Sequence, residues 1–191
     1  MGIIQSINKN LIRELEDNEA IALLVKQRLS FENWMKIQII QELINAGIPK
    51  ENIIPERNHR VDITFYLNKK NYTIELKTLP TSYIYDNARE YAGNGINNIH
   101  TLYSDIDKMK YLGYEKGFLI FVVYPFDRKN RKHNLEWKLQ RDKIKKLSKI
   151  SLERDINFAN GLKGVLYSCD LIWKESTKNI QNRRDLLTRK E

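Results

Sequence analysis

Hydrophobic residues near the start of the chain recur at the spacing of α-helices. Over residues 8–29, apolar side chains follow one another at three- and four-residue steps, which predicts an N-terminal helix there. Ser30 is a suitable N-cap for a second helix over 31–46, with Gly47 just past its end. The first quarter of the chain is therefore expected to be helical.

Alternation of hydrophobic and polar positions replaces this pattern further along the chain. The segments 61–67 and 72–77 both alternate, as strands with one buried face do. The polar residues 68–71 between them have the composition of a turn. The two segments therefore predict a β-hairpin.

The second half of the chain mixes the two patterns. Residues 100–112 have helical spacing, and 118–124 is a continuous apolar run typical of a strand buried on both faces. A basic helix over 136–149 and a short apolar strand over 164–169 follow. This order predicts an α/β fold with a mixed central sheet flanked by helices, in a single domain over 1–191.

Composition narrows the class of protein. The chain has 191 residues, of which 41% are hydrophobic and 30% charged, so it can form a core and is not of the disordered class. Its one cysteine, Cys169, excludes an internal disulfide and favours a reducing compartment. No apolar run is long enough to span a membrane, and we expect a cytoplasmic protein without a signal peptide.

The net charge of +9 is concentrated in one segment. Residues 128–149 contain ten basic residues and two acidic ones, a net charge of +8. Such a cluster is typical of a surface that binds a polyanion, and Lys143, Lys145 and Lys146 are its candidate DNA contacts. The alternative is an ordinary solvated helix face.

The hairpin carries the candidate chemistry. Alternation places Asp62 and Glu75 on the same face of the two strands, with Lys77 one pleat further along. Two neighbouring carboxylates repel each other unless a positive charge neutralises them, and Mg²⁺ prefers such oxygen ligands. The alternative is a pair of solvent-exposed carboxylates that form ion pairs with Arg60 or Lys77.

This pattern resembles a known family. Asp62, twelve intervening residues and then Glu75-Leu76-Lys77 are similar to the D-x(n)-(D/E)-x-K signature of the PD-(D/E)XK nuclease superfamily. The predicted order of elements over residues 30–125 is also similar. The resemblance implies a restriction-endonuclease-like αβββαβ core, followed by the basic helix and C-terminal elements over 128–191. Val61 departs from the family pattern, which has a proline before the Asp.

The resemblance implies roles for these residues. Asp62 and Glu75 would be catalytic residues that hold Mg²⁺, or Mn²⁺ in its place, together with the backbone carbonyl of Leu76. Lys77 would orient or activate the attacking water.

Many family members add a glutamate from the first core helix. Glu32 is the best candidate for this further catalytic residue and Glu42 the second. The alternative for Glu32 is a helix-dipole role, because an acidic residue in the first turn stabilises a helix.

Two loops contain candidate DNA contacts. Arg57, His59 and Arg60 flank the expected site and are suited to gripping phosphates. Asn94 and Asn97 lie in a stretch rich in Tyr and Asn, whose side chains suit contacts with base edges. The alternative for both loops is simple solvation.

The resemblance implies an Mg²⁺-dependent endonuclease that hydrolyses phosphodiester bonds in double-stranded DNA, with a type II restriction endonuclease as the leading role. A homodimer is expected because two strands must be cut, and no organic cofactor is expected. The alternatives are a Holliday junction resolvase or DNA-repair nuclease of the same fold, a non-catalytic DNA-binding protein with that fold, and a basic RNA-binding protein.

Overall fold

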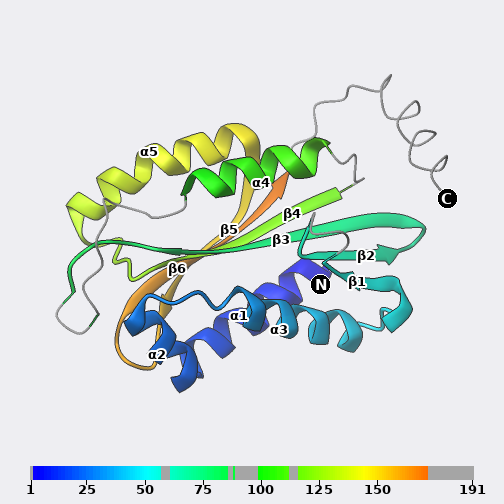
Figure 1. Ribbon diagram of the computed structural model, residues 1–191, viewed down its shortest axis with the longest axis horizontal. Helices are drawn as coiled ribbons and strands as arrows, with labels where there is room; N and C mark the ends of the chain where they lie inside the picture. The colour runs from blue at the N-terminus through cyan, green and yellow to red at the C-terminus, as the bar shows by residue number, and fades with distance from the viewer. Residues whose placement is uncertain (1, 57–60, 86–87, 89–98, 112–115, 172–191) are drawn as a thin grey trace.

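Helices cover both faces of a six-stranded mixed sheet (Figure 1). The computed structural model describes residues 2–56, 61–85, 88, 99–111 and 116–171. These residues confirm the predicted α/β fold class with a mixed central sheet flanked by helices. No described helix is long and apolar enough to cross a membrane.

The sheet has the strand order β1-β2-β3-β4-β6-β5. Neighbouring strands are antiparallel except for β3 and β4, which run parallel. The strands are β1 (Ile53–Pro55), β2 (Ile63–Leu67), β3 (Lys70–Pro80), β4 (Lys116–Tyr124), β5 (Ser148–Asn157) and β6 (Lys163–Leu171).

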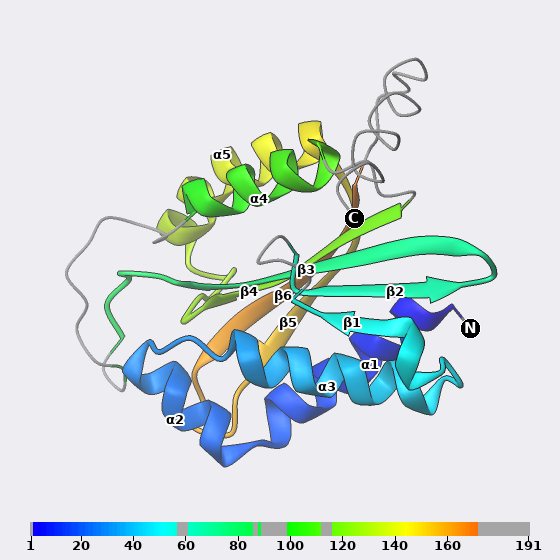
Figure 2. The ribbon, with the colours of Figure 1, turned by 45° about the vertical axis from the view of Figure 1, so that its right-hand side comes forward.

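The helices form two layers, one on each side of the sheet (Figures 1 and 2). On one face lie α1 (Ile3–Asp17), α2 (Glu19–Gln27) and α3 (Glu32–Asn45). On the other lie α4 (Ile99–Tyr111) and α5 (Arg131–Leu147). A 3₁₀ turn, η1 (Lys50–Asn52), leads into β1.

The prediction of one N-terminal helix over 8–29 is wrong, because Asn18 divides this segment into α1 and α2. Asn18 has extended backbone dihedrals, and its side chain accepts a hydrogen bond from the Ile21 N–H at 3.1 Å, so it caps α2. The predicted N-cap of the next helix is off by one residue. Phe31 occupies that position, and the Ser30 hydroxyl accepts from the Glu32 N–H at 3.4 Å.

The predicted hairpin is confirmed, although its turn is tighter than expected. The turn consists of Asn68 and Lys69, whose φ values of +51° and +62° are those required by a type I′ turn. The last register pair of the hairpin is Ile63 with Ile74. Beyond it, β3 continues to Pro80 without a partner strand on the β2 side among the described residues. This unpaired stretch is the free edge of β3.

Two strands were missed and one helix was placed too late. The strand β1 has only three residues, and β5 is an edge strand whose outward positions are mostly polar, so neither has a clear hydrophobic pattern. The basic helix begins at Arg131 rather than 136. The Asn130 side chain accepts hydrogen bonds from the N–H groups of Lys132 and His133, which fixes that start.

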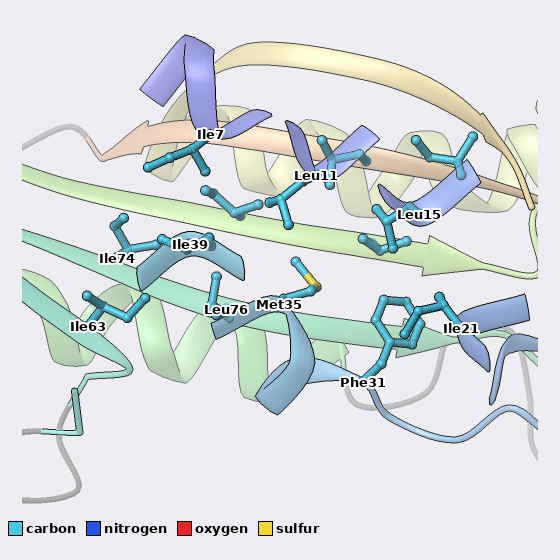
Figure 3. Packing of buried hydrophobic residues seen from close by; sticks show 14 of the residues in the cluster. Ile7, Leu11, Leu15, Ile21, Phe31, Met35, Ile39, Ile63, Ile74 and Leu76 are labelled. Carbon is cyan, nitrogen blue, oxygen red and sulfur yellow. The ribbon is translucent and has the colours of Figure 1, made fainter. Parts of the chain in front are cut away.

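Strand alternation produces a separate hydrophobic core on each face of the sheet. Figure 3 shows Ile74 and Leu76 of β3 beside Met35 and Ile39 of α3, and these four side chains are fully buried. The intervening residues of β3, Glu75 among them, belong to the opposite face, which α4 and α5 cover. Alternation along β3 therefore directs Glu75 and Lys77 towards α4.

Gly164 in β6 offers a test of packing in this sheet. A Cβ there would lie 2.8 Å from the Phe158 ring and 2.9 Å from the Val123 carbonyl oxygen. We expect Gly164→Ala to lower the free energy of unfolding by about 1–3 kcal/mol in urea denaturation, because overpacking forces these neighbours to move. Lys149→Ala on exposed β5 is the control and should change it by less than about 0.5 kcal/mol. Equal stability of Gly164→Ala and the unsubstituted chain would contradict this packing.

Candidate active site

Side-chain carboxylates continue the hydrogen-bond ladder at the free edge of β3. The Leu76 N–H donates to Asp62 Oδ2 and the Thr78 N–H donates to Glu32 Oε1, both at 2.8 Å. Backbone donors buried without a partner are costly, so the two carboxylates supply the acceptors that β2 no longer provides. This requirement places one acid from α3 and one from the residue just before β2 along the same strand.

Asp62 and Glu75 come together where the hairpin opens. The Asp62 N–H donates to Glu75 Oε2 at 3.3 Å. Their side chains are 19% and 6% exposed, so neither carboxylate is fully solvated. The Leu76 carbonyl points to the same edge as the Leu76 N–H, because both groups of one strand residue face the same neighbour.

Two lysines lie against these acids. Lys36 Nζ of α3 is 3.0 Å from Asp62 Oδ1 and also forms an ion pair with Glu56. Lys108 Nζ of α4 is 3.6 Å from Glu75 Oε1. Each carboxylate of the pair thus contacts its own lysine, and the two lysines come from helices on opposite faces of the sheet.

Lys77 contacts α4 rather than the hairpin acids. Lys77 Nζ lies 2.9 Å from Asp105 Oδ2, and Lys108 Nζ lies 3.4 Å from Asp105 Oδ1. Acidic and basic side chains therefore alternate from Glu75 through Lys108 and Asp105 to Lys77.

The environment keeps a proton on Glu75. Burial, followed by the negative charges of Asp62 and Asp105, raises the pKa of Glu75 to about 8, although Lys108 and Lys77 act in the opposite direction. This carboxyl group therefore ionises at neutral pH only when further positive charge is brought to it.

Lys77 is held as an ammonium. Burial lowers its pKa, but the hydrogen bond and the charge of Asp105 outweigh burial and raise the pKa above its usual value. Lys77 can therefore donate hydrogen bonds and supply positive charge, but it is not a free base.

The oxygen groups at this edge fit a hard cation such as Mg²⁺. Asp62, Glu75 and the Leu76 carbonyl provide oxygen donors only, and Glu75 requires added positive charge in order to ionise. Among the described residues, however, no three His, Cys, Asp or Glu side chains form a group suited to a metal. The protein would thus provide two carboxylates and one carbonyl as ligands of such a cation.

The two candidate glutamates of α3 lie at opposite ends of that helix. Glu32 Oε1 also lies 3.1 Å from the Thr78 hydroxyl, and its charge acts on Lys77. Glu42 accepts a hydrogen bond from Asn45 Nδ2 at 3.3 Å. A catalytic role for either residue stays a prediction.

The predicted DNA contacts are placed only in part. The loop residues Arg57, His59, Arg60, Asn94 and Asn97 lie outside the described residues. In contrast, the lysines predicted on the basic helix, Lys143, Lys145 and Lys146, are exposed on α5.

Two of the ten basic residues of 128–149 are neutralised by β5. Arg128 forms ion pairs with Glu153 and Asp155, and Arg141 pairs with Glu153 at 2.6 Å. The other eight are exposed and make up what we name the α5 basic surface: Lys129, Arg131, Lys132, Lys138, Lys143, Lys145, Lys146 and Lys149.

Sequence reasoning missed the helix residues that surround the acids. Lys36 is four residues after Glu32, so both lie on one side of α3, and Lys108 is three residues after Asp105 on α4. These spacings are visible in the sequence. They do not show which strand each helix side meets.

Comparisons of the chain with protein-family models, with curated proteins and with solved structures find no significant match. The resemblance to the nuclease superfamily therefore rests on the residue pattern of the sequence alone.

The raised pKa of Glu75 makes stability depend on pH. An acid with a higher pKa in the folded than in the unfolded chain binds more protons when folded. The free energy of unfolding should therefore fall as pH rises from about 5 to 8 in EDTA, by at most about 1.4 kcal/mol per pH unit. Glu75→Gln should remove this loss, as urea unfolding across that range would measure.

Glu51→Gln, an exposed carboxylate of η1, is the matched control and should leave the slope unchanged. Parallel pH profiles for Glu75→Gln and the unsubstituted chain would show that Glu75 ionises normally.

Proposed function

We propose that this protein is an Mg²⁺-dependent endonuclease that hydrolyses phosphodiester bonds in double-stranded DNA. The observation that carries the proposal is the gathering of Asp62, Glu75 and Lys77 around the free edge of β3, linked through Lys108 and Asp105. A cation held by these neighbouring acids, together with the ammonium of Lys77, would stabilise the negative charge that develops on a phosphate during hydrolysis.

The connectivity of the sheet supports the same proposal. The order α3, β1, β2, β3, α4, β4 runs through an antiparallel meander and then crosses over through α4 to a parallel strand. This order agrees with the αβββαβ core of restriction-endonuclease-like folds. Asp62 lies just before the second strand of this order and Glu75 lies on the third, which supports the proposal.

Each residue of the site has a definite task in this proposal. Asp62, Glu75 and the Leu76 carbonyl would hold Mg²⁺, which would supply Lewis acidity at this edge of β3. Lys77 donates hydrogen bonds to the attacking water or to a phosphate oxygen, and Asp105 keeps it protonated and directed.

The lysines beside the acids position them. Lys36 fixes Asp62 through the contact to Oδ1, while Asp62 Oδ2 is held by the Leu76 N–H. Lys108 provides part of the positive charge that Glu75 needs.

The α5 basic surface supplies a means of holding DNA. Six of its eight residues lie on α5, which is in the same helix layer as α4, the helix that carries Asp105 and Lys108 (Figures 1 and 2). Lysines and arginines that neutralise phosphates release counterions and give affinity without sequence preference. Sequence recognition would then come from other segments.

Cutting both strands of a duplex favours a homodimer, with one site for each strand. A type II restriction endonuclease is the leading role. The alternatives are a Holliday junction resolvase, a repair nuclease and a non-catalytic DNA-binding protein. Cleavage of plasmid DNA and of four-way junctions distinguishes them.

Cleavage of plasmid DNA with Mg²⁺ tests the proposed chemistry. We expect Asp62→Asn to cut roughly 10²–10³-fold more slowly than the unsubstituted chain, because a carboxylate that would hold Mg²⁺ at the scissile phosphate is removed. Asp107→Asn, an exposed carboxylate of α4, is the control and should cut at the unsubstituted rate. The rate of loss of supercoiled plasmid on agarose gels measures both.

The products separate the alternatives. Discrete fragments indicate a restriction enzyme, and cutting only of four-way junctions indicates a resolvase. Binding to DNA without cutting of any substrate, or equal cleavage by Asp62→Asn, would contradict the proposed site.

The salt dependence of DNA binding tests the α5 basic surface. Changing Lys143, Lys145 and Lys146 to Glu should lower the slope of log K against log salt by about one for each of these lysines that neutralises a phosphate. Fluorescence anisotropy with a labelled duplex in EDTA measures this slope. The control changes three exposed lysines elsewhere, Lys26, Lys50 and Lys70, to Glu. Equal slopes for the two triple variants would show that these α5 lysines do not bind DNA and form an ordinary solvated helix face.

A further inference from the structure

A second candidate site lies on the opposite face of the sheet. A cavity of about 790 Å³ lies between the first turns of α1 and the strands near the β2–β3 turn. Its lining includes Phe65 and Phe118, which belong to the core of the α1–α3 face, whereas Glu75 belongs to the α4 face. The start of α1 lies beside this end of the sheet (Figure 2). The cavity is therefore separate from the candidate active site.

Three aromatic rings from neighbouring strands form one wall of the cavity. The ring centroids of Phe65 and Tyr72 are 5.1 Å apart with an interplanar angle of 11°. Those of Tyr72 and Phe118 are 6.5 Å apart at 8°. Ile4 and Ile12 of α1 also line the cavity, and this apolar, aromatic-rich lining suits an aromatic body of the size that pockets of several hundred Å³ accept.

Asn8 of α1 supplies a hydrogen-bond acceptor in the lining. Its side chain is buried, with 6% of the residue exposed, and Oδ1 has no hydrogen-bond partner among the described residues. Buried acceptors without a donor are rare because they lose their hydration. A ligand N–H group in the cavity would satisfy Oδ1.

The rim of the cavity is positively charged. Lys9, Lys116 and Arg154 line it and are exposed, and none forms a salt bridge within the part of the chain that the structure describes. Lys116 Nζ lies 5.4 Å from the centre of the Phe118 ring, so one charge is next to the aromatic wall. Asp170 is the one carboxylate in the lining. This balance favours an anionic group on the ligand.

We infer that the cavity binds a purine nucleotide. The ligand has to combine a planar aromatic body, an N–H donor within it, and an anionic group at one end. A purine base, with its N–H groups, and a phosphate meet all three requirements. A fatty acid meets only the last, because its chain is neither planar nor a donor.

Isothermal titration of the intact chain with AMP in EDTA tests this inference. We expect saturable binding of one AMP per chain, and weaker binding of adenosine because it lacks the phosphate. Asn8→Leu, which removes the acceptor at similar size, should weaken AMP binding by about tenfold. Asn33→Leu, an exposed residue of α3, is its control and should bind AMP normally.

A second variant leaves the buried residue Asn8 unchanged. Lys116→Gln with Arg154→Gln alters exposed side chains only, and should weaken AMP while leaving adenosine unchanged; Lys26→Gln is its control. The inference fails if AMP shows no saturable binding up to about 10 mM, an affinity below that of specific small-molecule sites. It also fails if AMP binds equally to both site variants, or if laurate saturates the cavity and AMP does not.

Discussion

The backbone donors of β3 beyond Ile74 need acceptors that β2 does not provide, and the arrangement of the site follows from how they are satisfied. Asp62 and Glu32 accept the N–H groups of Leu76 and Thr78. Each acid is thereby tied to the strand that carries Glu75 and Lys77. The same hydrogen bonds that complete the sheet edge thus gather the acidic groups, so stability and candidate chemistry share one set of contacts.

The gathered charges are balanced from both helix layers. Lys36 reaches Asp62 from α3, while Lys108 and Asp105 reach Glu75 and Lys77 from α4. This balance is incomplete, because the pKa of Glu75 remains raised to about 8. A buried acid that needs one more positive charge is the physical basis for proposing a cation there.

Hydrophobic alternation could be read from the sequence for the hairpin, the buried strand β4 and most helices, because these patterns are local. The break at Asn18 and the strand β5 were missed for different reasons. At Asn18 the apolar spacing continues across the break, since both helices bury side chains against the same sheet. The outward positions of β5 are polar because it pairs only with β6 and has an open edge.

The sequence by itself determined that Asp62, Glu75 and Lys77 share one face of a hairpin, because strand alternation depends only on spacing along the chain. Only the tertiary structure decided which groups surround them. Lys36 lies 26 residues before Asp62, and Asp105 lies 28 residues after Lys77, and no local pattern relates residues so far apart. Their meeting depends on how α3 and α4 pack on opposite faces of the sheet, which the burial of both hydrophobic cores sets.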